Sequence, residues 1–498
     1  MCPNSMDELP ARERVLKVNR ILLVILLLLP ASVLARDWII STTGDDAKGD
    51  GTLAKPYRTV MRVLNTSNGT AKAGDTVMLR GPEGNNTYNE CLVRLRVPLT
   101  LRSYPGEHAH IHCDPHAPES SVVVWLDASA SGSHISDLDL SGSAYYGVKL
   151  DTNWYRGGGE KGTGASHVVL DHLKIHDTGR DGIKITPKSD YVTIRNSEIW
   201  NTGKIYPPGT SEQAKNADGI DNVNGSHMVV EDCYIHDIAT TGLYFKGGAS
   251  DALVQRNRIE NTGSGGIRVG FDTGEEYFDP SVNPKYYESI RGTVRNNFIR
   301  NTDSAGIGLY AAKDAVVANN TLVDTARKNQ AAIFFGITFQ DWDPKAGRPP
   351  SINPLIRNNL VIQNGGNCLE IRWSPDLGGL SALDGSPGTD WNGYYNSVGR
   401  CNFVDFRLPH PLVIGGSFAQ WQRHSGVDAH SVETAFSVDD TGHLPDGSPA
   451  IDKGIALEQV TDDIDRQRRV APYDIGADEK VETPAATKVD SSHSLKPH

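Results

Sequence analysis

Three observations in the sequence predict an all-β protein, built as a right-handed parallel β-helix. The 498 residues include 50 glycines and are 38% hydrophobic, which is typical of a turn-rich β protein. An Asn or Asp follows an apolar segment at intervals of 24, 36, 24, 40 and 23 residues, and a Gly–aliphatic pair recurs in the same units. The repeated residues are Asp177, Asn201, Asp237, Asn261, Asn301 and Asp324.

The repeat unit favours short stacked strands over other solenoids. The second marker consists of Gly182, Gly219, Gly242, Gly266 and Gly306, each followed by Ile or Leu. Apolar and variable residues alternate after these glycines, as expected for a strand with one buried face. A unit of about 24 residues with two insertions is too short for a helical pair or a propeller blade, and the leucine-rich pattern is absent. A coil of parallel strands is the remaining interpretation.

Residues 1–35 are interpreted as an export signal. Basic residues precede the apolar run 21–29, and Val33-Leu34-Ala35 fits a signal peptidase site. An uncleaved anchor is the alternative, although the run is short for a bilayer span of about 20 residues. We therefore expect a secreted or periplasmic protein that begins near Arg36.

The remaining chain divides into four expected parts. Residues 36–133 form an N-terminal cap and first coils with a short helix near 57–65, because an open solenoid end must be covered. Residues 134–375 carry the repeats and the site. Residues 376–480 supply C-terminal coils and a closing segment, and the polar tail 481–498 is expected to be disordered.

Five cysteines follow the signal, so at least one thiol is expected to be free. Cys91 with Cys113 and Cys368 with Cys401 are possible disulfides in an exported chain, but the connectivity stays open. Cys233 occupies a repeat column that otherwise contains asparagine, so it is interpreted as a packed structural residue. The asparagines of that column are Asn257, Asn297 and Asn320.

The net charge of −12 argues against a general nucleic-acid-binding protein. Solubility is the simpler explanation of this charge. It does not exclude an acidic substrate held in a local basic cleft.

Counting from the marker glycines predicts which side chains share one surface. The position after each glycine points inward, so the second and fourth positions point outward. The outward residues are Lys184, Asp221, Tyr244 and Arg268 in the first column, and Lys246 and Tyr310 in the second. Adjacent coils lie about 4.8 Å apart, so these residues should form one exposed patch. Asp181 and Asp218 precede their glycines and should meet at its edge.

Three insertions at 204–216, 271–288 and about 338–351 are expected to build walls around this patch. Tyr277 and Trp342 in these insertions are candidates for stacking on sugar rings. Packing of the loops onto the solenoid is the alternative for each of these aromatic residues.

Proton abstraction from C5 of a uronate would use this set of groups. The reaction needs a cation beside the carboxylate, a base at C5 and a proton donor for the leaving oxygen. Asp181, Asp218 and Asp221 form an oxygen-rich cluster suited to Ca²⁺. Lys246 is the candidate base and Arg268 the candidate partner of the substrate carboxylate.

Three further assignments complete the expected site. Tyr244 is a candidate proton donor or relay, and Lys184 and Tyr310 are candidate substrate-binding residues. The histidines, including His176 and His236, show no metal-ligand spacing and are interpreted as coil-surface residues.

The chain resembles the parallel β-helix polysaccharide lyases. A coil-edge Asp, then DGID, then a Lys before a Gly pair is similar to the calcium-dependent pectate lyases of family nine. That resemblance implies that Asp181, Asp218 and Asp221 bind calcium and that Lys246 is the base. The family usually has two adjacent aspartates before the glycine, and Ala217 replaces the first of them here.

A second resemblance concerns Lys246 and Arg268, which are 22 residues apart. This pair is similar to the Lys and Arg of the family-six alginate lyases and chondroitinase B, where Lys is the base. The glutamates that those enzymes place before the Lys as metal ligands are replaced by Leu243 and Tyr244. The segment 462–479 also resembles the closing segment of many secreted bacterial β-helix proteins.

These observations predict an exported lyase that cleaves pectate, alginate or a glycosaminoglycan-like polysaccharide by β-elimination. Its expected partners are this acidic polysaccharide and Ca²⁺, with no nucleic acid, no membrane after signal cleavage and a monomeric state. A C5-epimerase, a glycoside hydrolase and a non-catalytic glycan-binding β-helix protein are the alternatives.

Overall fold

The computed structural model describes residues 35–64, 70–154, 162–211, 214–338, 348–375, 379–407 and 412–480. The chain divides into the units Met1–Arg36 and Asp37–His498, and the fold described here is that of the second unit. The export signal expected before Arg36, the tail expected after residue 480 and Trp342 lie outside the described residues.

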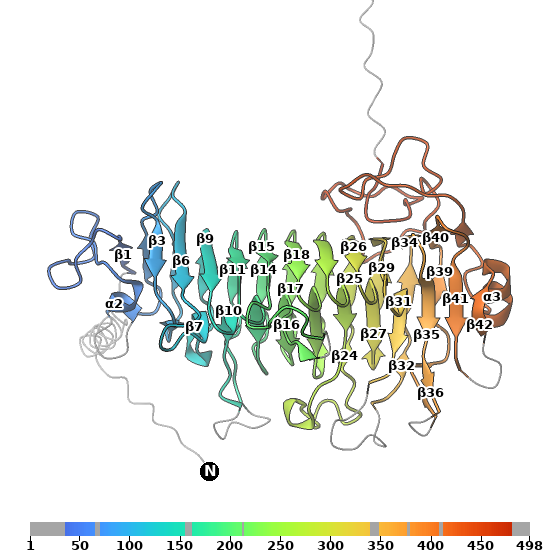
Figure 1. Ribbon diagram of the computed structural model, residues 1–498, viewed down its shortest axis with the longest axis horizontal. Coiled ribbons are helices and arrows are strands. Elements are labelled where there is room, and N and C mark those ends of the chain that lie inside the picture. The colour runs from blue at the N-terminus through green and yellow to red at the C-terminus, as the bar shows by residue number, and fades with distance from the viewer. Residues whose placement is uncertain are drawn as a thin grey trace, which may run out of the picture. The chain divides into compact units, whose positions relative to one another are not determined.

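Three long sheets, each of 12 strands, form the unit, and Figure 1 shows their strands following one another coil by coil. The first sheet contains β1 (Asp37–Ile40), β2 (Thr76–Leu79), β5 (Thr100–Ser103), β8 (His134–Ser136), β11 (Val169–Asp171), β14 (Thr193–Arg195), β17 (Val229–Glu231), β21 (Leu253–Gln255), β25 (Thr293–Arg295), β29 (Val316–Ala318), β33 (Leu355–Arg357) and β39 (Thr389–Asp390).

The second sheet will carry the candidate active site. It contains β4 (Val93–Leu95), β7 (Val122–Leu126), β10 (Tyr146–Leu150), β13 (Ile183–Ile185), β16 (Ile220–Val223), β19 (Leu243–Lys246), β23 (Ile267–Val269), β27 (Ile307–Tyr310), β31 (Ala331–Gly336), β35 (Asn367–Ile371), β41 (Asn402–Asp405) and β42 (Leu412–Gly416). Its strands pair in parallel up to β41, and β42 pairs antiparallel to β41.

The third sheet contains β3 (Thr87–Asn89), β6 (Ala109–Cys113), β9 (Leu138–Gly142), β12 (Lys174–His176), β15 (Glu198–Trp200), β18 (Tyr234–Ile238), β22 (Arg258–Thr262), β26 (Phe298–Thr302), β30 (Thr321–Val323), β34 (Leu360–Gln363), β40 (Gly393–Asn396) and β43 (Val432–Glu433). A short sheet of β20 (Ala249–Ser250), β24 (Ser289–Ile290), β28 (Ala312–Lys313), β32 (Ser351–Ile352) and β38 (Leu383–Asp384) and the hairpin β36 (Trp373–Ser374) and β37 (Leu380–Ser381) complete the strands described.

The structure explains why Asn or Asp and a Gly–aliphatic pair recur in each repeat. The recurring Asn or Asp adopts a left-handed backbone with φ between 50° and 56°, a conformation that these two residues tolerate well. A Cβ on Gly219 would lie 2.4 Å from the carbonyl oxygen of Gly242 in the next coil, so this position requires glycine. The inward positions after the marker glycines are fully buried: Ile183, Ile220, Leu243, Ile267 and Ile307. The predicted parallel β-helix is confirmed in these details.

A ladder of buried asparagines joins the coils between the first and third sheets. Asn257 Nδ2 donates to Asn297 Oδ1 at 2.9 Å, and Asn297 Nδ2 donates to Asn320 Oδ1 at 2.9 Å. The ladder continues through Asn359 to Asn392. Such ladders satisfy buried amide groups while holding successive coils in register. The predicted column of stacked asparagines is confirmed.

The cysteine interpretation is also confirmed. Cys91 pairs with Cys113 and Cys368 pairs with Cys401, while Cys233 is free and buried. Burial raises the pKa of the Cys233 thiol to about 12, so this thiol is protonated and unreactive at neutral pH.

Short helices lie near both ends of the stack (Figure 1). Helix α2 (Val60–Leu64), within the predicted 57–65 region, contributes Val60, Val63 and Leu64 to the main core. Helix α3 (Phe418–Ser425) buries Trp421 against Phe403 at 5.4 Å between ring centroids. The 3₁₀ helices η1 (Ala128–Ala130) and η5 (Glu275–Tyr277) lie in connections between strands. No helix in the described residues is long and apolar enough to cross a membrane.

The C-terminal closing segment runs back along the side of the coils, although it was expected to finish the stack. Asp462 pairs with Arg256 at 2.8 Å, and Asn358 Nδ2 donates to the carbonyl oxygen of Ile455 at 2.8 Å. Arg469 is buried and donates to Asn296. These contacts reach coils that precede the segment by 97 to 206 residues, so it braces the corner where the asparagine ladder lies.

The substitution Asn297→Ala should destabilise the protein by roughly 1–3 kcal/mol for each buried N–H that loses its acceptor. The backbone N–H and Nδ2 of Asn257 both donate to Asn297 Oδ1, so both are affected. Urea unfolding followed by circular dichroism measures the loss. Asn86→Ala, which removes an exposed side-chain hydrogen bond to the carbonyl oxygen of His108, is the control. Equal effects of the two substitutions would contradict a stabilising role of the ladder.

Candidate active site

The parallel register of the second sheet brings the predicted outward column together. Lys184 pairs in register with Asp221, Asp221 with Tyr244, and Tyr244 with Arg268. Lys246 aligns with Val223 in the next column. The backbone N–H of Asp218 donates to Asp181 Oδ1 at 3.0 Å, so the two coil-edge aspartates are neighbours as expected.

This column is covered, although the sequence predicts an exposed patch. Asp221 is 1% exposed, Tyr244 3% and Arg268 8%, and Lys246 is half-buried. The insertion after β23 places Phe271 beside Tyr244 and Arg268, and the Lys184 side chain lies over Asp221. Asp221, Tyr244 and Arg268 are therefore shielded from water by neighbouring side chains.

Asp181, Asp218 and Asp221 form a buried carboxylate cluster. Each contributes one oxygen to a set in which all oxygens lie within 4.8 Å of one another. Asp218 Oδ1 accepts hydrogen bonds from Thr240 Oγ1 at 2.7 Å and from the N–H of Thr241 at 2.8 Å. Asp181 Oδ2 and Asp221 Oδ1 are buried without a hydrogen-bond partner in the described part of the chain.

Burial and mutual repulsion shape the charge of this cluster. Burial raises the pKa of Asp181 well above its usual value, and the neighbouring Asp221 raises it further. The same two causes raise the pKa of Asp218, against the hydrogen bonds from Thr240 and Thr241. Without a compensating cation, the cluster therefore retains protons that isolated aspartates would lose.

Lys184 partly compensates this charge. Its ammonium forms an ion pair with Asp221 Oδ2. Burial alone would lower the pKa of Lys184, but the carboxylates of Asp221 and Asp181 outweigh burial and raise it. Lys184 was expected to bind substrate, yet it contacts the carboxylate cluster and is not among the residues that line the cleft described next.

The carboxylate cluster fits a hard divalent cation. If an ion displaces the retained protons, the three carboxylates and Lys184 carry two negative charges together, and two buried oxygens have no hydrogen-bond partner among the described residues. Oxygen donors with this charge are the ligands that Ca²⁺ prefers.

A cleft of about 780 Å³ lies over the second sheet. Its basic lining residues are Lys215, Lys246, Arg268 and Arg372, and Asp218 is the one carboxylate among the described lining residues. Its aromatic lining residues are Tyr244, Phe271, Tyr310, Phe334 and Trp373. In a chain of net charge −12, this cleft combines local positive charge with ring surfaces that can stack on sugars.

Lys246 and Arg268 meet at Phe271 in this cleft. The Lys246 ammonium lies 4.4 Å from the Tyr244 ring centroid and 5.5 Å from that of Phe271, and the Arg268 guanidinium lies 4.1 Å from Phe271. Lys246 Nζ donates to the carbonyl oxygen of Asp272 at 2.9 Å. Arg268 donates to Ser264 Oγ, while its Nε has no hydrogen-bond partner among the described residues.

The two tyrosines at the cleft remain protonated at neutral pH. Burial raises the pKa of Tyr244, and the nearby carboxylates of Asp218 and Asp221 raise it further. Burial also raises the pKa of Tyr310, whose hydroxyl accepts a hydrogen bond from Gln330 Nε2 at 3.3 Å. Both hydroxyls can therefore donate a proton or a hydrogen bond to a bound ligand.

Tyr277 lies outside the cleft, and several residues that line the cleft were not predicted from the sequence. Tyr277 lies in η5, where its carbonyl oxygen accepts a hydrogen bond from Asn224, and it does not line the cleft. Phe271, Arg372 and Trp373 line the cleft but were not predicted. Phe271 follows the Arg268 strand directly, so its place in the insertion was an available signal. Arg372 and Trp373 come from coils beyond the region in which the repeat is clear.

A buried ion pair anchors the 271–288 insertion behind Lys246. Arg348 Nε lies 3.0 Å from Glu288 Oε1, and both side chains are fully buried. Glu288 Oε2 accepts from Thr273 Oγ1 at 2.6 Å and from the N–H of Gly247 at 2.9 Å. Burial raises the pKa of Glu288 to about 7, against the effects of Arg348, Thr273 and Gly247. The pair thus fixes the backbone next to Lys246.

The substitution Arg348→Met should destabilise the protein by about 3–5 kcal/mol at neutral pH, because it leaves the Glu288 carboxylate buried and unpaired. A carboxyl whose pKa is raised on folding loses stability as pH rises, so the deficit should be larger at about pH 8 than at about pH 5.5. Thermal unfolding at both pH values measures it.

The control for that substitution is Arg291→Met. Arg291 forms an exposed pair with Asp251 at 2.7 Å, and its loss should change stability by at most about 1 kcal/mol. A deficit in the Arg348 variant that is no larger than in this control, or that is independent of pH, would contradict the role of the buried pair.

Comparisons with known proteins agree with this architecture. A family model described as a right-handed β-helix region matches residues 124–279. No curated protein sequence matches the chain.

Several solved structures are similar to the chain. The pectate lyase Pel9A has 12% identity and a TM-score of 0.50, over 90% of this chain and 96% of its own. A GH136 lacto-N-biosidase from Eubacterium ramulus has 14% identity and a TM-score of 0.43, over 74% of this chain and 60% of its own. An alginate lyase from Paenibacillus sp. str. FPU-7 has 17% identity and a TM-score of 0.41, over 67% of this chain and 95% of its own. The chain is a right-handed parallel β-helix protein.

Proposed function

We propose that this protein is a polysaccharide lyase that cleaves an acidic, uronate-containing polysaccharide by β-elimination. The observation that carries the proposal is the pairing of Lys246 and Arg268 in a basic, aromatic cleft directly beside the buried carboxylate cluster. The fold shared with the pectate lyase Pel9A makes pectate the first substrate to test.

In the proposed reaction, each of three residues has a separate role. Arg268, which lines the cleft, pairs with the substrate carboxylate and so acidifies the C5 proton. Lys246 Nζ accepts that proton, while an N–H of the same group keeps its hydrogen bond to the Asp272 carbonyl oxygen. The electrons of the C5–H bond form the C4–C5 double bond as the C4–O bond breaks. Tyr244 gives its proton to the leaving oxygen. After product release, Lys246 loses the C5 proton to solvent and Tyr244 takes one up from solvent.

Asp181, Asp218 and Asp221 would hold Ca²⁺ in this proposal. When bound, the ion supplies positive charge beside the substrate carboxylate. The chain's own contribution is to keep the three carboxylates buried and close together, with Thr240 and Thr241 orienting Asp218.

A hydrolase is less well supported by this site. An inverting or retaining hydrolase needs two carboxyl groups that flank the scissile bond. Asp218 is the one carboxylate among the described residues that line the cleft, and Asp221 is 1% exposed and paired with Lys184. Lys246 and Arg268 would also have no task in hydrolysis.

The protein is proposed to act outside the cytoplasm as a monomer. The two disulfides support export, because such bonds persist in oxidising compartments.

The wild-type protein should release unsaturated products from pectate, alginate or a glycosaminoglycan, and these are followed by ultraviolet absorbance. The substitution Lys246→Ala should lower kcat by about 10²–10⁴-fold, as expected for loss of a general base. Lys174→Ala on the exposed face of β12 is the control and should keep full activity. Saturated reducing ends, or full activity of the Lys246 variant, would refute the proposal.

Calcium should raise Tm, and chelation should lower both Tm and activity. The Tm increase should be larger at about pH 8 than at about pH 5, because protons retained by Asp181 and Asp218 compete with the ion at low pH. Asp221→Asn should abolish the increase, while Asp251→Asn at an exposed ion pair should preserve it. If neither calcium nor chelator changed Tm, the proposal that the carboxylate cluster binds Ca²⁺ would be wrong.

A further inference from the structure

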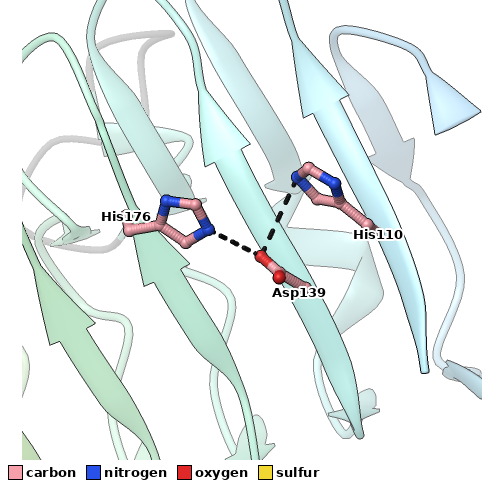
Figure 2. A group of neighbouring side chains, drawn as sticks. All are labelled: His110, Asp139 and His176. Carbon is pink, nitrogen blue, oxygen red and sulfur yellow. Dashed lines mark hydrogen bonds and ion pairs between the residues drawn. The ribbon is translucent and has the colours of Figure 1, made fainter. Parts of the chain in front are cut away.

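The outward face of the third sheet carries a second cluster of ligand-forming side chains. His110 on β6, Asp139 on β9 and His176 on β12 come from three successive coils (Figure 2). One atom from each lies within 4.8 Å of the other two. Their side chains are 23%, 33% and 16% exposed, so an ion from solvent can reach them.

The two distances from Asp139 to the histidine nitrogens lie on either side of the separation expected between two ligands of one metal ion. Asp139 Oδ1 lies 2.9 Å from His176 Nε2 and 3.8 Å from His110 Nε2, as the dashed lines in Figure 2 show. Two ligands of a tetrahedral ion, each about 2.0–2.1 Å from it, are about 3.3 Å apart. Small side-chain rotations therefore suffice to place all three atoms around one ion.

Neighbouring groups orient both imidazoles. His176 Nδ1 faces Asp177 Oδ2 at 2.7 Å, which keeps a proton on Nδ1, while Nε2 faces Asp139 Oδ1 at 2.9 Å, so the Nε2 proton shared with Asp139 is the one that an ion displaces. A carboxylate behind a histidine is the usual outer contact of a metal-binding imidazole. The His176 ring also stacks on Trp200, with 4.3 Å between centroids. Ser141 Oγ, 2.7 Å from His110 Nε2, orients this ring, and an ion bound at Nε2 would replace that hydrogen bond.

We propose that His110, Asp139 and His176 bind a divalent transition-metal ion of the Zn²⁺ class. Two imidazoles and one carboxylate suit Zn²⁺, whereas Ca²⁺ prefers oxygen ligands alone. This site lies on the third sheet, so it is separate from the carboxylate cluster on the second sheet and independent of the proposed lyase activity. The bound ion links β6, β9 and β12 through their side chains and stabilises the N-terminal coils.

Isothermal titration of Zn²⁺ into the tag-free mature protein, after treatment with chelator and exchange into calcium-containing buffer, tests this proposal. We expect one Zn²⁺ site whose Kd rises at least about tenfold in His176→Gln and in Asp139→Asn. Zn²⁺ should also raise the Tm of the wild type and not of these variants. Asp139→Asn preserves side-chain shape, so it keeps the test valid if the histidine variant folds poorly.

Two further histidines provide matched controls. His236 lies in the same outward column, with Asp237 at Nδ1 and Glu198 3.3 Å from Nε2, but without a second histidine in its group. His443 forms another group with Asp465 and Asp478. His236→Gln and His443→Gln should retain wild-type Zn²⁺ affinity.

Three outcomes would overturn the proposal. These are an absence of Zn²⁺ binding, equal affinity in the His176 and His236 variants, or loss of binding only in the His443 variant. Loss of lyase activity in Lys246→Ala with unchanged Zn²⁺ binding would separate this site from the candidate active site.

Discussion

The parallel register between successive coils is the constraint on which every candidate site in this protein depends. Each backbone ladder holds one coil against the next, so a residue acquires neighbours that are 23 to 40 positions away in the chain. The asparagine ladder and the returning C-terminal segment reinforce this register at one corner. A shift by one residue would turn Asp221, Tyr244 and Arg268 inward and destroy both the core and the site.

Charged side chains on the second sheet form two groups, one buried and one facing the cleft. The carboxylate cluster and Lys184 lie buried at one position of the sheet, while Lys246 and Arg268 face the cleft. The basic groups can attract an acidic polymer to a protein that is acidic overall. In the proposed function, the buried carboxylates would hold a cation close to the substrate carboxylate.

The two faces show how one repeat can support different chemistry. The second sheet gathers oxygen ligands at the coil edge, and the third sheet gathers imidazoles on its outer face. His110 and His176 are far apart in sequence and have no metal-ligand spacing along the chain. Their proximity arises because both belong to the third sheet on coils that flank Asp139. Spacing rules for continuous motifs therefore miss sites that are assembled across coils.

The sequence by itself determined the β-helix, the inward column, the asparagine ladder and the grouping of Asp181, Asp218 and Asp221 with Tyr244 and Arg268. These features follow from a period, and a period is visible in one chain. Burial of the outward column, the pairing of Lys184 with Asp221, the Arg348–Glu288 anchor and the path of the C-terminal segment were decided only by the tertiary structure. They depend on where insertions and distant segments fold back, and such contacts leave no repeat in the sequence.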